Sequence, residues 1–164
     1  MKKVHLLNLG NPRKVKQNLS GILEQLELEK IEAEIAANTV ALYRLGGEFL
    51  SFALKQSPAN WRQRVSRLYY AAYNISRAVR LFVSGEYSSE TEDHQKFHKL
   101  PDDFPRKDQY ANQLAVLRED RNMCDYDHTC LPTDLVLDTA RSASLVIEFL
   151  DHAKLYLEKR GLKL

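Results

Sequence analysis

The chain of 164 residues has few of the residues that interrupt regular structure, with only six glycines and five prolines. An all-β domain with many tight turns needs more of both, so the composition argues against that class. No apolar run approaches the roughly 18 residues of a membrane span, and we expect no membrane association. The basic start is followed by an apolar stretch of only about five residues without a small-residue cleavage site, which argues against a signal peptide.

Cysteine is also scarce, because Cys124 and Cys130 are the only two. Two cysteines make no disulfide framework, so we expect a cytoplasmic protein. Their spacing matches no familiar zinc motif, and a site built on His94 and His98 would need Cys124, His128 and Cys130 to be brought over by a long loop. We therefore predict neither a metal nor another cofactor. A glycine-rich phosphate loop and a nucleophile elbow are also missing, which excludes P-loop enzymes and α/β hydrolases.

The net charge of +2 is too small to indicate a nucleic-acid-binding protein, but the charges are unevenly distributed. Residues 1–23 contain basic side chains and no acid, whereas residues 24–34 are rich in glutamate. Residues 58–85 again lack acids and contain the arginines Arg62, Arg64, Arg67, Arg77 and Arg80. Such a basic helix either binds an anionic partner or, more commonly, is a solvated face whose aliphatic stems cover the core.

What the chain does contain is enough apolar sequence, 44% of its residues, to bury the core of one ordinary domain. Apolar side chains recur at helical spacing in four long segments, and no run shows the alternation of a strand. The first expected helix covers residues 20–56, and the second begins at Pro58 and ends before Gly85, its C′ residue. The third covers residues 107–127, and the fourth has Thr133 as its N-cap and ends near Lys159. Gly46 and Gly47 are predicted to kink or break the first of them.

These segments predict an all-α fold, an antiparallel bundle of four or five helices over residues 20–164. We interpret residues 1–19 as a basic N-terminal arm. Its short apolar run, Val4 to Leu9, is expected to be extended, with little of the core depending on it. Residues 86–107 are predicted to form a loop, because they combine acids, histidines and two prolines.

The third predicted helix departs from the usual pattern. Its apolar stripe starts at Tyr110 and continues, with the same four-and-three step, through Arg121, Cys124 and His128. Positions seven apart differ by only about 20° in direction, so we expect Arg121 and His128 to share the buried side of the helix. Asp125 is close enough in sequence to orient the guanidinium. In one interpretation Arg121 and Asp125 form a structural ion pair, and His128 lies at the helix end, where the helix dipole favours it. In the other, this side of the helix opens into a groove or a subunit interface.

Two segments, RLYYAAYNISRAVRLF (67–82) and LREDRNMCDYDH (117–128), resemble the HEPN domain family. The similarity is to its small prokaryotic branch, whose third helix carries an Arg-x-x-Ala-Asp-Tyr motif. Arg121, Asp125 and Tyr126 are in register with that motif, and Cys124 replaces its alanine. The resemblance extends over about residues 25–158 and leaves the basic arm out.

The resemblance implies a helical bundle that forms a homodimer along the helices with the arginine motif. Many members carry Arg, four to six residues and then His, and are metal-independent endoribonucleases, some of them toxins or defence components. Here Arg121 is followed by six residues and then by His128, with a polar Asn122 directly after the arginine. Other members are non-catalytic, and some are encoded beside a small nucleotidyltransferase. The predicted catalytic residues are Arg121 and His128, supported by Asn122, Asp125 and Tyr126.

The chemistry of metal-free RNA cleavage fits these two side-chain types. A histidine can move protons near neutral pH, and an arginine can stabilise the charge on a phosphate in the transition state. Along one helix the two would stand about 10 Å apart, so two copies across a two-fold axis would grip one phosphate better. The sequence leaves three hypotheses open: a dimeric RNase, a non-catalytic protein that binds a nucleotide or a nucleotidyltransferase, and a structural dimer.

The second predicted helix offers a further set of candidates. Tyrosines alternate there with arginines and an asparagine, side chains that can stack on bases and bind phosphates. A tyrosine-rich bundle core is the commoner explanation of such a cluster. The predicted nucleotide- or RNA-binding residues are Arg67, Tyr70, Asn74 and Arg77.

Overall fold

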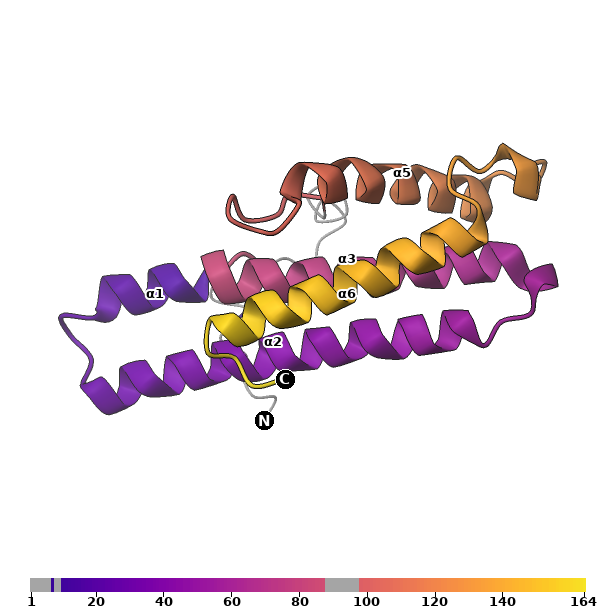
Figure 1. Cartoon of the computed structure of the whole chain (residues 1–164). Helices are drawn as coiled ribbons and strands as arrows, with labels where there is room; N and C mark the ends of the chain where they lie inside the picture. The colour runs from indigo at the N-terminus through magenta and orange to yellow at the C-terminus, as the bar shows by residue number, and fades with distance from the viewer. Residues whose placement is uncertain (1–6, 8–9, 88–97) are drawn as a thin grey trace.

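The computed structural model describes residue 7 and residues 10–87 and 98–164. In these residues the fold is all-α, with five helices packed together and no strand, as the sequence predicts (Figure 1). The helices are α1 (Pro12–Leu19), α2 (Gln25–Leu54), α3 (Trp61–Ser84), α5 (Lys107–Tyr126) and α6 (Thr139–Lys159). Two short 3₁₀ turns, η2 (Pro58–Asn60) and η3 (Pro132–Asp134), precede α3 and α6. None of the described helices combines the length and the hydropathy that a membrane crossing requires.

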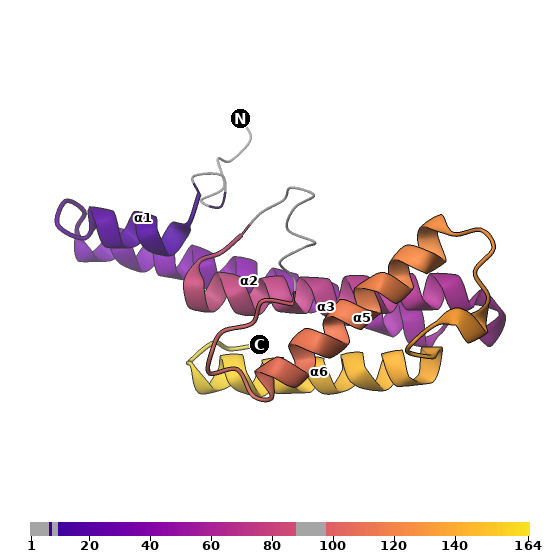
Figure 2. The ribbon, with the colours of Figure 1, turned by 90° about the horizontal axis from the view of Figure 1, so that it is seen from above.

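Helix α3 is the centre of the bundle, and α2 runs beside it for most of its length (Figure 1). Helix α6 packs on the same pair, whereas α5 crosses α3 and α6 at a steep angle (Figure 2). This position explains why α3 is buried on nearly every side, polar residues included. The largest fully buried side chains come from α2, α3, α5 and α6: Ile35, Val65, Leu68, Tyr69, Ile75, Leu81, Tyr110, Leu114, Leu117, Phe149 and Leu157.

Helix α2 continues without interruption through Gly46 and Gly47, so the prediction of a break there is wrong. Gly46 is instead a point of close helix contact. A Cβ atom at this position would lie 2.7 Å from Ile75 Cδ1 and 3.0 Å from the carbonyl oxygen of Ala71 on α3. The missing side chain lets the two longest helices approach each other, and tight interhelical packing outweighs the low helix propensity of glycine.

Within the predicted basic N-terminal arm, residues 12–19 form a helix, α1, which the sequence analysis does not predict. The local signals are a proline at the first helical position and an N-cap side chain. Asn11 Oδ1 accepts hydrogen bonds from the backbone N–H groups of Arg13 and Lys14, at 3.0 and 3.1 Å. Lys2 and Lys3 lie outside the described residues.

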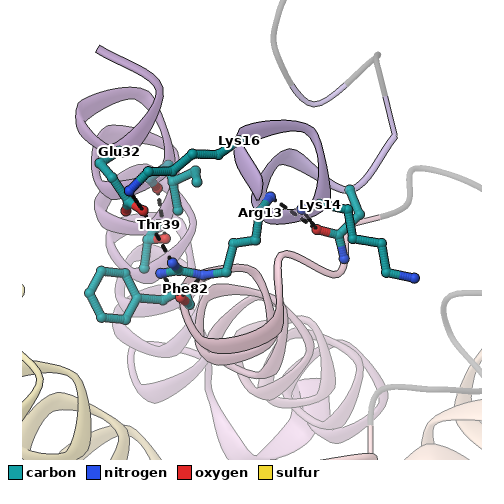
Figure 3. Close-up of polar contacts among 8 residues, drawn as sticks. Arg13, Lys14, Lys16, Glu32, Thr39 and Phe82 are labelled. Carbon is teal, nitrogen blue, oxygen red and sulfur yellow. Dashed lines mark hydrogen bonds and ion pairs between the residues drawn. The ribbon is translucent and has the colours of Figure 1, made fainter. Parts of the chain in front are cut away.

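Two of the basic side chains of α1 bind the bundle itself (Figure 3). The Arg13 guanidinium donates to the carbonyl oxygen of Phe82 near the end of α3, with Nε at 2.6 Å. Lys16 Nζ lies 2.8 Å from a carboxylate oxygen of Glu32 on α2, and Arg13 Nη1 lies 3.4 Å from the same oxygen. The charges of the segment therefore stabilise its own docking on α2 and α3.

Helix α6 begins later than predicted. Asp138, not Thr133, is its N-cap, and the Asp138 carboxylate accepts from the N–H groups of Ala140 and Arg141 at 2.9 and 2.8 Å. The segment before Thr139 is held in another way, because Val136 and Leu137 donate their N–H groups to Asp120 on α5. Backbone groups engaged by a side chain of another helix are unavailable for an earlier helical turn. In the predicted 86–107 loop, residues 88–97 lie outside the described residues.

Candidate functional site

The Arg121 side chain lies between α5 and α3 and is 13% exposed. Its Nη2 donates to the hydroxyl oxygen of Tyr70 at 2.8 Å, and its Nη1 donates to Asn122 Oδ1 at 3.2 Å. Its Nε lies 2.7 Å from Asp125 Oδ2, one helical turn farther along α5. The predicted pairing of Arg121 with Asp125 is therefore confirmed, and the guanidinium is held from three sides.

Aromatic rings complete the surroundings of Arg121. Its Cζ lies 5.3 Å from the ring centroids of Tyr69, Tyr70 and Tyr126, a distance at which the ring faces attract a cation. Burial lowers the pKa of Arg121, but the Asp125 carboxylate and the hydroxyls of Tyr70 and Tyr126 outweigh it and raise the pKa above its ordinary value. The group is a permanent cation in a fixed orientation.

His128 lies elsewhere than the sequence predicts. Helix α5 ends at Tyr126, Asp127 has extended backbone angles, and His128 is exposed in the following loop. The inference that Arg121 and His128 share one buried helical face is therefore wrong, because the helix ends before the second of them. The loop is nevertheless ordered by Asp127, whose carboxylate accepts from the N–H and hydroxyl of Thr129 at 2.8 and 2.6 Å. These hydrogen bonds hold the pKa of Asp127 below its usual range.

Arg62, at the start of α3, secures this loop and was missed as a site residue in the sequence. Its Nη1 donates to the carbonyl oxygens of Cys124 and Asp127 at 2.9 and 2.6 Å, and its Nη2 to that of Cys130 at 2.6 Å. One guanidinium thus binds the free carbonyls at the end of α5 together with the turn that follows. Its partners are about 60 residues away in the chain, and no local signal predicts such a contact.

Asp120 is a second residue whose role the sequence reasoning missed. It is fully buried, and its two carboxylate oxygens accept the N–H groups of Val136 and Leu137, each at 2.9 Å. A signal for it was present, because Asp120 follows Leu117 by three and precedes Cys124 by four, on the apolar side of α5. This carboxylate anchors the segment between α5 and α6.

The four residues predicted to bind nucleotides are only partly brought together. Tyr70 joins Arg121, and Arg67 lies over the rings of Phe49 and Phe52 on α2. Asn74 is buried and donates to the carbonyl oxygen of Tyr70 at 2.8 Å. The remaining member, Arg77, lies over the rings of Tyr73 and Tyr87, farther along α3. Tyr70 and Arg67 thus adjoin the site, whereas Asn74 and Arg77 contribute to packing.

The cysteines and histidines form no metal centre in the described part of the chain, where no three His, Cys, Asp or Glu residues are arranged to hold an ion. His94 lies outside the described residues. Cys124 and Cys130 are buried free thiols. Burial, with a smaller contribution from nearby Cys130, raises the pKa of Cys124 to about 12. Cys124 therefore remains a neutral thiol, which is a poor nucleophile and a poor metal ligand.

Comparison of the chain with protein-family models, with curated proteins and with solved structures finds no match. The chemistry available at the site is that of one oriented cation, Arg121, next to a loop that carries an exposed imidazole. Such a pair can bind an anion and move a proton.

Proposed function

We propose that this protein is a metal-independent endoribonuclease of the HEPN type that acts as a homodimer. The observation that supports the proposal is the fixed, charged guanidinium of Arg121 at the end of α5, directly before the ordered loop that presents His128 to solvent. An arginine anchored by Tyr70 and Asp125 is preorganised to stabilise negative charge without moving during the reaction.

The reaction needs no cofactor. The ribose 2′-hydroxyl loses its proton and attacks the adjacent phosphorus, the bond from phosphorus to the 5′-oxygen breaks, and that oxygen receives a proton. The products are a 2′,3′-cyclic phosphate and a 5′-hydroxyl end. His128 moves the protons, and Arg121 stabilises the extra charge on the phosphate oxygens in the transition state.

A second copy of the chain brings the two side chains together. Within one protomer Arg121 faces α3, whereas His128 is exposed in the loop beyond α5. On either side of His128 there are exposed apolar side chains, Tyr126 at 75% and Leu131 at 59%. Burial of these two side chains against a partner would favour dimerisation through the same loop, so that each site contains residues of both copies.

The test is cleavage of a single-stranded RNA by the purified protein, with and without EDTA. We expect EDTA to leave the rate unchanged and the products to end in cyclic phosphate. Arg121→Ala and His128→Ala should each lower the rate at least about 100-fold, the usual contribution of an acid–base group, while sedimentation still shows a dimer. Arg118→Ala, a partly exposed arginine on the same helix, is the matched control. Full activity in either site variant, or dependence on a metal, refutes the proposal.

A second candidate function is favoured by the low exposure of Arg121. A side chain that is 13% exposed and has three polar partners in its own protomer is suited to a structural role in a non-catalytic HEPN protein. Such a protein binds a nucleotide or a small nucleotidyltransferase encoded nearby. Calorimetric titration with ATP and co-purification with that enzyme measure these two kinds of binding. Binding in either experiment, together with no cleavage of RNA by the purified protein, would identify this function.

A further inference from the structure

A shallow groove lies beside the candidate site, between α2 and α3. We call it the Phe52 groove. It encloses about 290 Å³ and is lined by Leu45, Glu48, Phe49, Phe52 and Arg67. Phe52 is 50% and Leu45 39% exposed. Neighbouring apolar side chains that are partly exposed and bordered by charged residues, here Glu48 and Arg67, are typical of a binding surface.

The guanidinium of Arg67 identifies the chemistry of that ligand. Its Cζ lies 5.6 Å from the ring centroid of Phe49 and 5.7 Å from that of Phe52. Within the described ranges no hydrogen bond or ion pair engages this guanidinium, so its N–H donors are available to an acceptor from outside. A half-exposed ring beside a guanidinium whose N–H donors have no acceptor in the described part of the chain matches a molecule that combines a flat π-system with a negative charge, which is the composition of a nucleotide.

A contact between two aromatic rings connects the Phe52 groove to the candidate site. The ring of Phe49 lies 5.8 Å from that of Tyr70 at an angle of 32°. The hydroxyl oxygen of Tyr70 in turn accepts the hydrogen bond from Arg121. A polynucleotide with one phosphate near Arg121 therefore has an aromatic surface for a neighbouring base along the same side of α3.

We propose that the Phe52 groove binds one unpaired base of a single-stranded RNA. The base stacks on Phe52, and Arg67 contacts the phosphate next to it. The volume is close to the lower end, about 300 Å³, of small-ligand pockets, which suits one base and its sugar rather than a longer segment. The inference rests on the proposed function, to which it adds a substrate-binding subsite.

The experiment separates binding from cleavage by using an RNA that no ribonuclease of this mechanism can cut. The probe is a fluorescein-labelled 2′-O-methyl oligouridine of roughly 8 nucleotides, within the usual site sizes of single-strand binders, and the readout is fluorescence anisotropy of the full-length protein. Phe52→Ala should weaken binding about 5- to 150-fold, the range for the loss of one stacked base. Phe52→Trp should retain binding, whereas Phe52→Leu, which keeps apolar area without a ring face, should not.

Arg67→Gln tests the phosphate contact. We expect weaker binding and a salt dependence reduced by about one ionic contact, with little effect of base identity. A matched duplex should bind more weakly than the single strand, because paired bases cannot stack on Phe52. Leu155→Ala, which removes an exposed apolar side chain on α6, is the control and should bind like the wild type. Circular dichroism verifies that the variants fold.

Three results overturn the inference: no binding by the wild type, wild-type affinity in both Phe52→Ala and Arg67→Gln, or dissociation of the dimer in these variants, which would make the groove an interface between copies. Cleavage of ordinary RNA is measured separately. If Arg121→Ala abolishes cleavage while the groove variants bind normally, the proposed endoribonuclease activity is supported and the binding subsite is refuted. If the groove variants lose binding and neither the wild type nor any variant cleaves RNA, the binding subsite is supported and the proposed endoribonuclease activity is refuted.

Discussion

Asp120 and Arg121 are adjacent in the sequence, yet they serve opposite purposes in the fold. The Asp120 carboxylate is fully buried and binds two backbone N–H groups, so it stabilises the segment between α5 and α6. Arg121 retains a small exposed fraction and is surrounded by groups that keep it charged. At the residue scale, a buried ionised group needs polar partners: Asp120 has two backbone N–H donors, and Arg121 has Tyr70, Asn122 and the paired carboxylate of Asp125.

Asp120→Asn tests the importance of the buried carboxylate. An amide has only one oxygen, so the N–H of Val136 or of Leu137 would face an NH₂ group. We expect the free energy of unfolding to fall by about 2–3 kcal/mol, the contribution of a hydrogen bond to a charged group. Urea denaturation followed by circular dichroism measures the loss. Glu119→Gln, at the neighbouring exposed position, should change stability little, and equal stability of the two variants would contradict the role of Asp120.

At the scale of the element, α2 and α3 form the most extensive helix pair of the bundle. Their contact depends on Gly46, whereas a Cβ atom at Gly47, the next residue, would have no other group within 4 Å. Two adjacent glycines thus have different reasons to be there, and substitution by alanine distinguishes them.

Gly46→Ala should lower the free energy of unfolding by about 0.5–2 kcal/mol. A methyl group there meets Ile75 and the carbonyl of Ala71, and such overpacking costs more than the gain in helix propensity. Gly47→Ala is the matched control and should raise stability by up to about 1 kcal/mol, because only the propensity changes. Thermal or urea unfolding of both variants gives the comparison; the same sign of effect in both would contradict the close contact at Gly46.

The end of α5 is a second element-scale feature, because Arg62 connects it to the loop that carries His128. Arg62→Ala leaves the carbonyl oxygens of Cys124, Asp127 and Cys130 without this donor. We expect a loss of about 2–3 kcal/mol in stability, together with faster hydrogen exchange of the amides in residues 127–131. Gln63→Ala, at the adjacent exposed position, is the control. Unchanged exchange in the Arg62 variant would show that the loop is ordered by other contacts.

At the scale of the whole molecule, the core is rich in tyrosine. Burial is the main cause that raises the pKa of Tyr43 to about 12 and that of Tyr110 to about 12. The pKa values of Tyr69 and Tyr156 are raised in the same direction, also chiefly by burial. These hydroxyls lie on α2, α3, α5 and α6, so their ionisation would affect the packing of four helices and the stability of the entire bundle.

Stability should therefore be insensitive to these groups below pH 10 and should fall as the pH rises from 10 towards 12. In that window the unfolded chain, with ordinary tyrosines, releases protons that the folded protein retains, and deprotonation favours unfolding. Tyrosinate absorbance at about 295 nm and helicity should change together. A smooth titration near pH 10 with helicity intact would mean that the hydroxyls are accessible in the folded state.

The amino-acid sequence by itself determined the helical class, the beginning of α5 at Lys107 and the pairing of Arg121 with Asp125. These features depend on spacing along one helix, which the periodicity of the sequence reports directly. Only the tertiary structure decided that Gly46 is a contact point, that α1 docks on α2 and α3 and that α5 ends before His128. Each of these depends on a partner far along the chain, such as Ile75, Phe82 or Arg62, and local sequence contains no record of which distant group will satisfy a given backbone or side chain.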